Sequence, residues 1–278
     1  MIGIVYAFLS VFVQTYTPSI VINPTILLIL NFVSGCIVIS IAAYMAHFFS
    51  VGAQTAEIAL ERERQRSERL LLNILPATIV KRLEIEKGII ADRFDNATVL
   101  FAFIVGFTPL SEQLSPEKLV TTLSNLFAGF DDLTDKYGVE KIKTTGDLYM
   151  VAAGVPELRD DHVEAVVDFA LDLLDLTKAY RSQEDIKLEI RIGISSGPVV
   201  AGIIGKKKFV YDLWGDTVNT ASRMKSHGLP LEIQASQSTI NLLGNQYVLE
   251  DRGAIEIKGK AKLYTYLIKG RRNIVHEK

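Results

Sequence analysis

The sequence predicts an α+β domain that follows a membrane-spanning helix, and two patterns carry this prediction. From residue 96 onward, apolar runs typical of strands are interleaved with segments of helical periodicity, and adjacent strand-like runs between residues 139 and 153 are typical of a hairpin in a mixed sheet. The chain has no acidic or basic residue before Glu57, so all 30 basic and 32 acidic residues lie from there onward. An uncharged beginning ahead of a charged remainder favours an apolar anchor followed by a water-exposed domain.

The charged part is expected to hold a series of strands and four helices. Strands are expected at residues 97–105, 139–144, 147–153, 187–195, 198–204, 208–213, 231–235, 246–257 and 262–268, and helices at 116–136, 161–180, 215–226 and 236–243. No internal repeat or low-complexity stretch interrupts this series, so a single domain is expected.

The segment Thr25–Phe49 is the predicted membrane span. It has 25 residues without a charge, and as a helix it would extend roughly 37 Å at about 1.5 Å per residue, enough to cross a hydrocarbon core with some tilt. A helix buried in a soluble protein is the less favoured alternative at this length. Residues 2–22 are apolar but interrupted by Gln14–Pro18, which predicts a partial or short span. Residues 1–49 are therefore the predicted membrane region.

Four arginines follow this span closely enough to decide its orientation: Arg62, Arg64, Arg66 and Arg69. Positively charged residues next to a span favour the cytoplasmic side. We therefore expect a protein of the plasma or inner membrane, with everything after the span in the cytoplasm.

Residues 50–90 are expected to connect the membrane to the domain. Ser50–Arg69 is rich in Ala, Glu and Arg, and its apolar residues recur at alternating spacings of three and four, which predicts a two-stranded coiled coil. Glu63 and Ser67 fall on the seam and weaken it, and a single exposed helix is the alternative. Pro76 ends or kinks this helix ahead of a short connecting helix, so a hinge is expected there.

Composition argues against several classes of function. The net charge of −2 and the lack of a basic stripe give no reason to expect nucleic-acid binding. The single cysteine, Cys36, excludes an intrachain disulfide and is compatible with a reducing compartment. The four histidines are scattered along the chain and lack the spacing of metal ligands.

The most informative segment is Phe209–Arg223, which sets polar groups at fixed offsets inside an apolar run. A helix that opens near Asp216 or Thr217, both good N-caps, places Asn219 and Arg223 four residues apart on one face. An amide beside a guanidinium suits a ribose and a phosphate, because Arg offers planar, permanently charged donors. For this pair alone, a solvated helix face is the alternative.

This segment, with Gly197–Gly202 and Gly205 upstream, resembles the substrate-binding segment of the class III nucleotidyl cyclases, the adenylate and guanylate cyclases. Three further blocks resemble the family's phosphate-binding strand and loop, its metal-binding turn and its C-terminal phosphate contact: Val99–Thr108, Glu140–Asp147 and Ile257–Lys260. All four occur in the family's order within residues 75–270. On these blocks the chain is identified as a member of the family, of the membrane-anchored bacterial adenylate cyclase type.

The resemblance implies a fold. A catalytic domain over residues 91–270 would have a ferredoxin-like, palm-type βαββαβ core, and residues 271–278 would form a charged tail. The implied reaction is intramolecular: the ribose 3′-oxygen of ATP attacks the α-phosphorus, cyclic AMP forms and pyrophosphate leaves.

The resemblance also implies cofactors and partners. Two ions per site, Mg²⁺ or Mn²⁺, are held by two carboxylates of one protomer, while the other protomer reads the base and stabilises the transition state. The site therefore exists only in a dimer, either a homodimer or a pair with a second cyclase chain. The expected partners are ATP, that protomer and the membrane, with no nucleic acid.

Four positions match the residues that read the base and act on the ribose and α-phosphate. Lys143 and Asp212 match the adenine-reading pair: Lys143 would donate to a ring nitrogen and Asp212 would accept from the exocyclic amino group. Cyclases for GTP typically carry Glu and Cys there, so ATP is favoured. As the catalytic residues, Asn219 would orient the ribose and Arg223 would stabilise charge on the α-phosphoryl group.

The triphosphate is implied to bind along the backbone that follows the first strand. Ile104, Gly106, Phe107 and Thr108 would wrap it, with Gly106 permitting a close approach. Lys258 would contact the terminal phosphates.

The metal site is where the chain departs from the family. Asp147, in a Gly-Asp turn, is the implied metal-binding carboxylate, and the backbone of Ile104 is a further ligand. The family's other metal-binding Asp falls at Phe103, and a phenyl ring cannot bind magnesium. Losing one of two carboxylates removes on the order of several kcal/mol of metal and transition-state stabilisation.

Two hypotheses remain open. One is a membrane-anchored adenylate cyclase whose activity is impaired by Phe103. The other is a catalytically silent cyclase-like subunit that binds nucleotide and complements an active protomer. The intact substrate positions favour the first and Phe103 favours the second. A diguanylate cyclase is a distant third hypothesis, because the sequence has no Gly-Gly-Asp/Glu-Glu-Phe turn.

Overall fold

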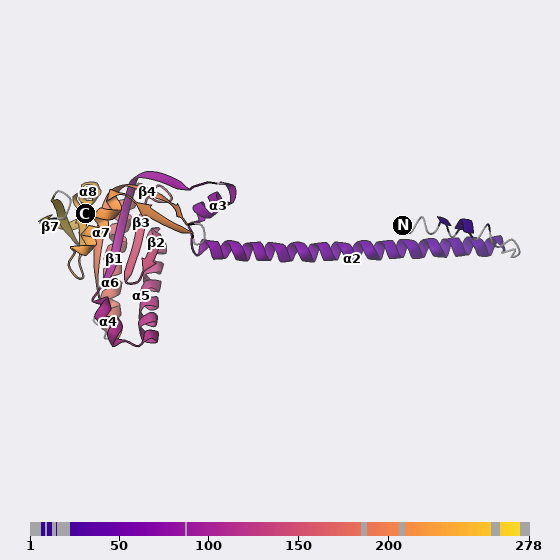
Figure 1. Cartoon of the computed structure of the whole chain (residues 1–278), viewed down its shortest axis with the longest axis horizontal. Helices are drawn as coiled ribbons and strands as arrows, with labels where there is room; N and C mark the ends of the chain where they lie inside the picture. The colour runs from indigo at the N-terminus through magenta and orange to yellow at the C-terminus, as the bar shows by residue number, and fades with distance from the viewer. Residues whose placement is uncertain are drawn as a thin grey trace, which may run out of the picture. The chain divides into compact units, whose positions relative to one another are not determined.

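The computed structural model of the chain describes residues 7–8, 10–12, 15, 23–86, 88–184, 188–205, 209–256 and 262–272 (Figure 1). The chain divides into two compact units, Met1–Arg69 and Leu70–Lys278. Apolar side chains are exposed along the described part of the first unit, whereas the second unit holds the buried core.

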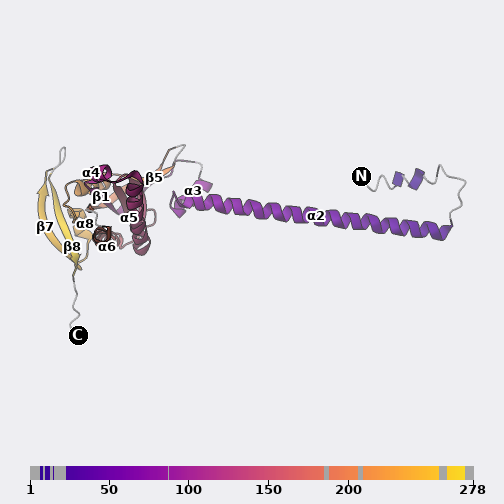
Figure 2. The same cartoon turned by 90° about the horizontal axis from the view of Figure 1, so that it is seen from below.

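The first unit consists mainly of α2 (Pro24–Leu72), a single helix of 49 residues (Figure 2). None of its side chains is buried, and among the described residues it is the one helix long and apolar enough to cross a membrane. The span expected at residues 25–49 and the helix expected after it are therefore one continuous element. Pairing of its second half into a coiled coil stays a prediction. Most of the short span predicted at residues 2–22 lies outside the described residues.

A break separates α2 from α3 (Ala77–Ile85), as the proline in this segment predicted. Pro76 is the N-cap of α3, with φ −56° and ψ 145°, a conformation outside the helical region. Ile79 and Val80 are the buried residues of α3, and they pack against the sheet of the second unit.

One eight-stranded sheet forms the centre of the second unit. Its strands are β1 (Ala91–Val105), β2 (Glu140–Thr145), β3 (Leu148–Ala153), β4 (Glu189–Ile204), β5 (Val210–Trp214), β6 (Ile233–Ser236), β7 (Tyr247–Ile255) and β8 (Leu263–Arg271). The order is β2-β3-β1-β4-β6-β8-β7, and β5 pairs with β4 outside this path. β4 and β6 are parallel, and the other pairs are antiparallel. The predicted mixed sheet is confirmed, with the β7–β8 hairpin at one edge (Figure 2).

Five helices connect these strands: α4 (Phe107–Gln113), α5 (Pro116–Tyr137), α6 (His162–Glu184), α7 (Asp216–Ser226) and α8 (Gln237–Leu242). The first four strands follow the order β1-α5-β2-β3-α6-β4, which is the βαββαβ arrangement that the resemblance implied. α5 begins where predicted because Ser115 accepts a hydrogen bond from the Lys118 N–H at 3.3 Å. It ends at Gly138, whose φ of 58° is left-handed and favours glycine.

Alternate residues of the central strands face two separate cores. Leu100 and Ile104 of β1 pack in the core that α5 and α6 cover. Val99 and Phe101 point to the opposite face, where α3 and α7 pack. Phe103 continues this alternation, so its side chain lies on the α7 face of the sheet.

Two strands are longer than predicted because of one irregularity. β1 begins at Ala91 instead of near residue 97, since a register shift between Phe94 and Ala97 lets the strand continue. Opposite this shift lies Pro198 on β4, which has no register partner on β1. A proline there interrupts no ladder hydrogen bond, so the strands expected at residues 187–195 and 198–204 form the single strand β4.

The C-terminal strand also extends beyond the predicted domain end at residue 270. β8 includes Arg271, which pairs with Asp168 at 2.7 Å and Asp172 at 3.2 Å on α6. These ion pairs tie the end of the sheet to a helix on its face, and residues 273–278 of the predicted tail lie outside the described residues.

Candidate functional site

Lys143 on β2 and Asp212 on β5 form a cluster that we name the purine end. Lys143 Nζ donates a hydrogen bond to Asp212 Oδ2 at 2.5 Å, and Asp212 Oδ1 accepts one from the Leu213 N–H at 2.8 Å. The two side chains are 35% and 18% exposed, so the pair remains open to a ligand. The predicted adenine-reading residues, 69 positions apart in sequence, are therefore direct neighbours in the fold.

The predicted triphosphate-binding backbone lies where β1 ends. Gly106 adopts a left-handed conformation, with φ 67° and ψ 27°, and caps α4. Phe107 and Thr108 then form the first turn of α4, where the resemblance implied a loop. The Leu110 N–H donates to the Gly106 carbonyl at 3.1 Å, which closes that turn. Thr108 is exposed, and its role in phosphate binding stays a prediction.

A second cluster, which we name the metal end, comprises Phe103, Ile104, Asp147, Arg191 and Lys225. The Ile104 N–H donates to the Asp147 carbonyl at 3.1 Å, which holds the end of β1 beside the turn between β2 and β3. Phe103 lies opposite Arg191 in the antiparallel register of β1 and β4. The fold therefore places the predicted metal-binding residues of one chain side by side.

Two cations also lie at the metal end. Lys225 Nζ of α7 lies over the Phe103 ring, 4.8 Å from its centroid. The Nε of Arg191 is buried and has no hydrogen-bond partner among the described residues. Burial lowers the pKa of the Lys225 ammonium, while the nearby Asp147 carboxylate raises this pKa and Arg191 lowers it.

The residues of the metal end do not fit two divalent ions. Magnesium requires near-octahedral oxygen coordination at about 2.1 Å, and Phe103 supplies no ligand. The remaining oxygen donors are the Asp147 carboxylate and the Ile104 backbone. Among the described residues, no group of three or more His, Cys, Asp or Glu side chains could hold a metal ion. Lys225 and Arg191 add positive charge that repels a cation.

α7 carries the predicted catalytic pair, and its first turn differs from the prediction. Gly215 is the N-cap, without a side-chain hydrogen bond, so neither Asp216 nor Thr217 caps the helix. Thr217 instead donates through Oγ1 to the Pro198 carbonyl at 2.8 Å. This bond ties the start of α7 to β4, which explains why the hydroxyl is not used as a cap.

Asn219 and Arg223 both lie on α7, four residues apart as predicted. Asn219 is exposed, and Arg223 Nη1 is buried without a partner in the described part of the chain. Arg223 and Lys225 project about 200° apart, because successive helical residues rotate by about 100°. Lys225 faces Phe103, so Arg223 leaves α7 on a different side of the helix. The remaining predicted contact, Lys258, lies outside the described residues.

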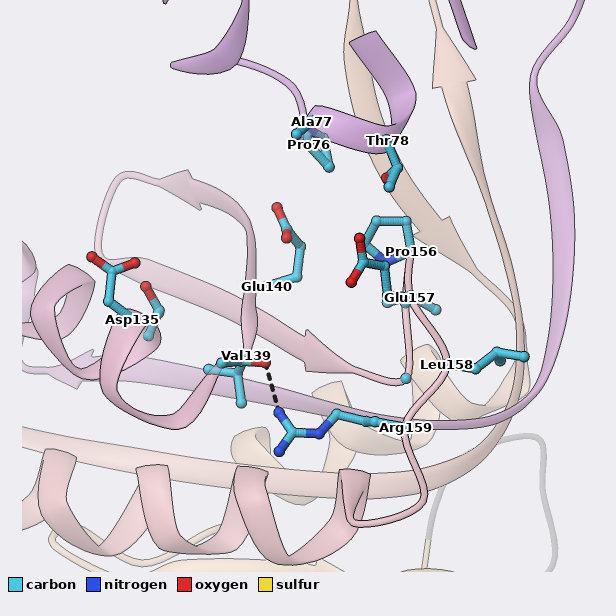
Figure 3. Close-up of a pocket in the computed structure, with 14 residues that line it drawn as sticks. Pro76, Ala77, Thr78, Asp135, Val139, Glu140, Pro156, Glu157, Leu158 and Arg159 are labelled. Atoms are coloured by element: carbon cyan, nitrogen blue, oxygen red, sulfur yellow. Dashed lines mark hydrogen bonds between the residues drawn. The ribbon is translucent and has the colours of Figure 1, made fainter. Parts of the chain in front are cut away.

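A cavity of about 530 Å³ lies elsewhere in the second unit, between the start of α3, the end of α5 and residues 154–159. Glu140 and Glu157 both line it, across from Thr78 of α3 (Figure 3). Burial raises the pKa of Glu140 to about 7, and the charge of Glu157 adds to the increase. None of the predicted site residues lines this cavity.

The comparison with protein families settles the class of this domain. Residues 89–270 match the adenylate and guanylate cyclase catalytic domain. The chain belongs to this family. An adenylate cyclase from Mycobacterium tuberculosis (strain ATCC 25618 / H37Rv) is 43% identical over 245 residues, which cover 88% of this chain and 55% of that protein. The chain thus spans about half the length of this curated relative.

Solved cyclase structures share the fold. The catalytic core of a rhodopsin-guanylyl cyclase with converted specificity, in complex with ATPalphaS, has a TM-score of 0.63 and 38% identity, over 65% of this chain and 98% of that one. The adenylyl cyclase CyaB from P. aeruginosa has a TM-score of 0.63 and 32% identity, over 66% of this chain and 97% of that one. The family predicted from four motif blocks is confirmed. Because these relatives include both adenylate and guanylate cyclases, family membership alone does not identify the purine.

Two residues of this cyclase domain were missed by the sequence analysis: Arg191 and Lys225. Arg191 is a lone arginine in an apolar strand, and Lys225 comes two positions after Arg223. A charge inside an apolar strand was a usable signal for Arg191. Nothing in the sequence pattern indicated that Lys225 would lie over Phe103, since that contact depends on how α7 packs on the sheet.

Proposed function

We propose that this chain is a membrane-anchored adenylate cyclase whose conversion of ATP to cyclic AMP and pyrophosphate is impaired by Phe103. The observation that carries the proposal is the Lys143–Asp212 pair of the purine end. Two charged groups from separate strands meet at 2.5 Å and remain partly exposed, inside a domain of the adenylate and guanylate cyclase family.

The purine end suits adenine better than guanine. In the neutral adenine ring N1 accepts a hydrogen bond and the exocyclic amino group donates, which matches an ammonium beside a carboxylate. Guanine presents a ring N–H donor and a carbonyl acceptor at the corresponding positions. It would therefore place donor against donor at Lys143 and acceptor against acceptor at Asp212, which strongly disfavours binding.

The proposed site is shared between two protomers. Arg223 lies about 200° around α7 from Lys225, which faces the metal end of its own chain, and the buried Nη1 of Arg223 lacks a partner among the described residues. A partner chain that brings its own metal end to this surface would present its bound ATP, with the α-phosphoryl group toward Arg223 and the ribose toward Asn219. A homodimer is the simplest such arrangement, and a second cyclase chain is the other.

Phe103 is the reason to expect low activity. The family's chemistry uses divalent metal ions, which acidify the attacking hydroxyl and neutralise the triphosphate. In a homodimer both sites would contain Phe103 and so lack one carboxylate. The second candidate function follows because only the metal site departs from the family. A chain with Lys143, Asp212, Asn219 and Arg223 in place could supply these residues to a protomer that has both metal-binding carboxylates.

The membrane assignment is part of the proposal. α2 is long and apolar enough to span a membrane, and the arginines that follow its apolar half favour the cytoplasm for the catalytic domain. We place the protein in the plasma or inner membrane on this basis.

The test is cyclic nucleotide formation by the full chain in detergent micelles, with ATP or GTP, in Mg²⁺ and then in Mn²⁺. We expect slow cyclic AMP formation and still slower cyclic GMP formation. A preference for GTP would contradict the assigned role of the purine end. The second measurement mixes this chain with a cyclase protomer that has both metal-binding carboxylates but lacks the arginine equivalent to Arg223. Product from the mixture, with none from either chain alone, would favour the second candidate function, a subunit that complements an active protomer.

A further inference from the structure

The metal end has a cation fixed in it by the packing of α7. Gly193 of β4 lies directly beneath this helix: a Cβ at that position would lie 2.0 Å from the Lys225 backbone nitrogen and 2.5 Å from the Ala221 carbonyl oxygen. Real Cβ atoms do not come so close, so glycine is what permits the contact. The backbone of residue 225 is therefore held against the sheet beside β1.

From this position the Lys225 side chain reaches the end of β1. Its Nζ lies 4.8 Å from the centre of the Phe103 ring, in cation–π geometry. The side chain is only partly buried. In the described part of the chain its ammonium contacts the Phe103 ring and interacts through charge with Asp147 and Arg191, without a salt bridge to a carboxylate. The ammonium is thus available to an anion that enters the site.

A second basic side chain adds positive charge beside Lys225 at the metal end. Arg191 lies across from Phe103 on β4, and its buried Nε has no hydrogen-bond partner among the residues described. Asp147 is the one predicted metal-binding carboxylate that remains. A surface with two cations and one carboxylate is suited to a polyanion and poorly suited to two divalent cations.

We propose that Lys225 binds the triphosphate of the nucleotide in place of one metal ion, so that ATP binding to this chain does not require divalent metal. The inference rests on the proposed nucleotide-binding function. Phe103 and Lys225 would then act together. The Phe103 ring stands in place of the family's metal-binding carboxylate, and the Lys225 ammonium rests on the face of this ring. A lysine ammonium binds phosphate as a point charge but does not activate a hydroxyl as a bound metal ion does. The arrangement would therefore retain binding and lower turnover.

The test is ATP binding by calorimetry to the full chain in detergent micelles, with EDTA, Mg²⁺ or Mn²⁺. For the wild-type chain we expect a Kd in EDTA within about threefold of the Kd in Mg²⁺. Lys225→Gln should raise the Kd in EDTA at least about tenfold, whereas Lys225→Arg, which keeps the charge, should stay close to wild type. Lys118→Gln is the matched control, because Lys118 is an exposed lysine of α5, on the opposite face of the sheet.

The outcomes separate this inference from the function on which it rests. Binding that requires metal and is unchanged in Lys225→Gln would overturn the role of Lys225 and leave the proposed function standing. Absence of ATP binding in all three conditions would overturn both. The melting temperature of each variant shows whether it is folded. Manganese electron paramagnetic resonance adds a count of ions per bound ATP, expected to be at most one, and a count of two would also overturn the inference.

Discussion

The purine end and the metal end of the candidate site differ in how their charges are balanced. At the purine end, Lys143 and Asp212 face each other at 2.5 Å, so each charge has an opposite partner. At the metal end, Lys225 rests on the uncharged ring of Phe103, and Arg191 has a buried nitrogen without a partner among the described residues.

The difference matches the part of a nucleotide that each end would accept in the proposed function. A neutral pair suits a neutral base, because the base must match one donor and one acceptor and brings no charge of its own. An excess of positive charge suits a triphosphate. In the proposed function, the chain would keep the features that bind a nucleotide and lack one carboxylate of the family's metal site, and the following experiments test that division.

Restoring the metal end should have the largest effect. Phe103→Asp with Lys225→Gln supplies the missing carboxylate and removes the lysine that would otherwise pair with it. We expect cyclic AMP formation in Mg²⁺ to rise at least about 100-fold over wild type, taking about 2.7 kcal/mol as the contribution of one charged metal ligand. The measurement is initial rate at saturating ATP, with the full chain in detergent.

The two single variants are the controls for this gain. Phe103→Asp alone should gain less than the double variant, because the new carboxylate lies within reach of the Lys225 ammonium. Lys225→Gln alone should gain nothing, since Phe103 still supplies no ligand. Equal rates for wild type and the double variant would refute the assignment of Phe103 as the lost metal position.

A mixing experiment tests whether the two ends belong to different half-sites. Both chains of this experiment carry Phe103→Asp and Lys225→Gln. Asp147→Ala in one chain should abolish metal binding at its metal end, and Arg223→Ala in the other should remove the guanidinium that acts on the α-phosphoryl group. A mixed dimer of these two chains keeps one undamaged set of both residues. We therefore expect the mixture to be at least about tenfold more active than either chain alone. No recovery, with mixed dimers demonstrated by cross-linking, would count against a shared site.

Exchanging donor and acceptor at the purine end should change the base and leave the metal end as it is. In the same active background, Lys143→Glu with Asp212→Cys should lower the ratio of ATP to GTP turnover at least about tenfold. The control is Lys141→Glu, a neighbouring lysine of β2 that pairs with Asp131 at 2.7 Å. A ratio that does not move would mean that other groups recognise the purine.

The sequence predicted the elements that carry the purine end, but it did not predict the side-chain contacts at the metal end. Lys143, Asp212, Asn219 and Arg223 lie in segments whose spacing and resemblance assign them to strands or to one helix, and the structure places them there. The substitution at Phe103 was visible for the same reason. What the site contains in place of the lost carboxylate depends on the contact between α7 and β4, which brings Lys225 over the ring. Such a contact has no local signature in the sequence.

The fold shows the same limit. The alternation of strands and helices predicted a mixed α+β domain, because the spacing of apolar residues in the sequence distinguishes strands from helices. The family resemblance implied the βαββαβ order of its core. The continuity of β4 through Pro198 was not predicted, since a proline is tolerated in a paired strand only where the opposite strand has an irregularity. That information is held by β1, about a hundred residues earlier in the chain.

Glu140 provides the smallest expected effect and a reference outside the site. Glu140 is the first residue of β2, the strand that carries Lys143. Its charged neighbour is Glu157, which has the same charge, whereas Lys143 has the oppositely charged neighbour Asp212. The pKa of Glu140 in the folded chain is about 7, above the ordinary value of a glutamate. A carboxyl whose pKa is raised by folding contributes its full stability below its ordinary pKa, and that contribution is lost as the pH rises through the folded value.

We therefore expect Glu140→Gln to match wild type in melting temperature near pH 4 and to exceed it at pH 8, with the gap opening between about pH 4.5 and 7. The stabilisation should be about 1–3 kcal/mol, or about 2–12 °C for a domain of this size. Glu157→Gln is the matched control: it removes only the neighbouring charge, so its gap should be smaller and the transition should shift toward lower pH.

ATP binding should be unchanged in both variants, because neither residue belongs to the purine end or the metal end. A gap of equal size at pH 4 and pH 8 would show that titration of Glu140 does not cause it. A change in ATP affinity would show that the cavity beside α3 is coupled to the candidate nucleotide site, although the two share no lining residue.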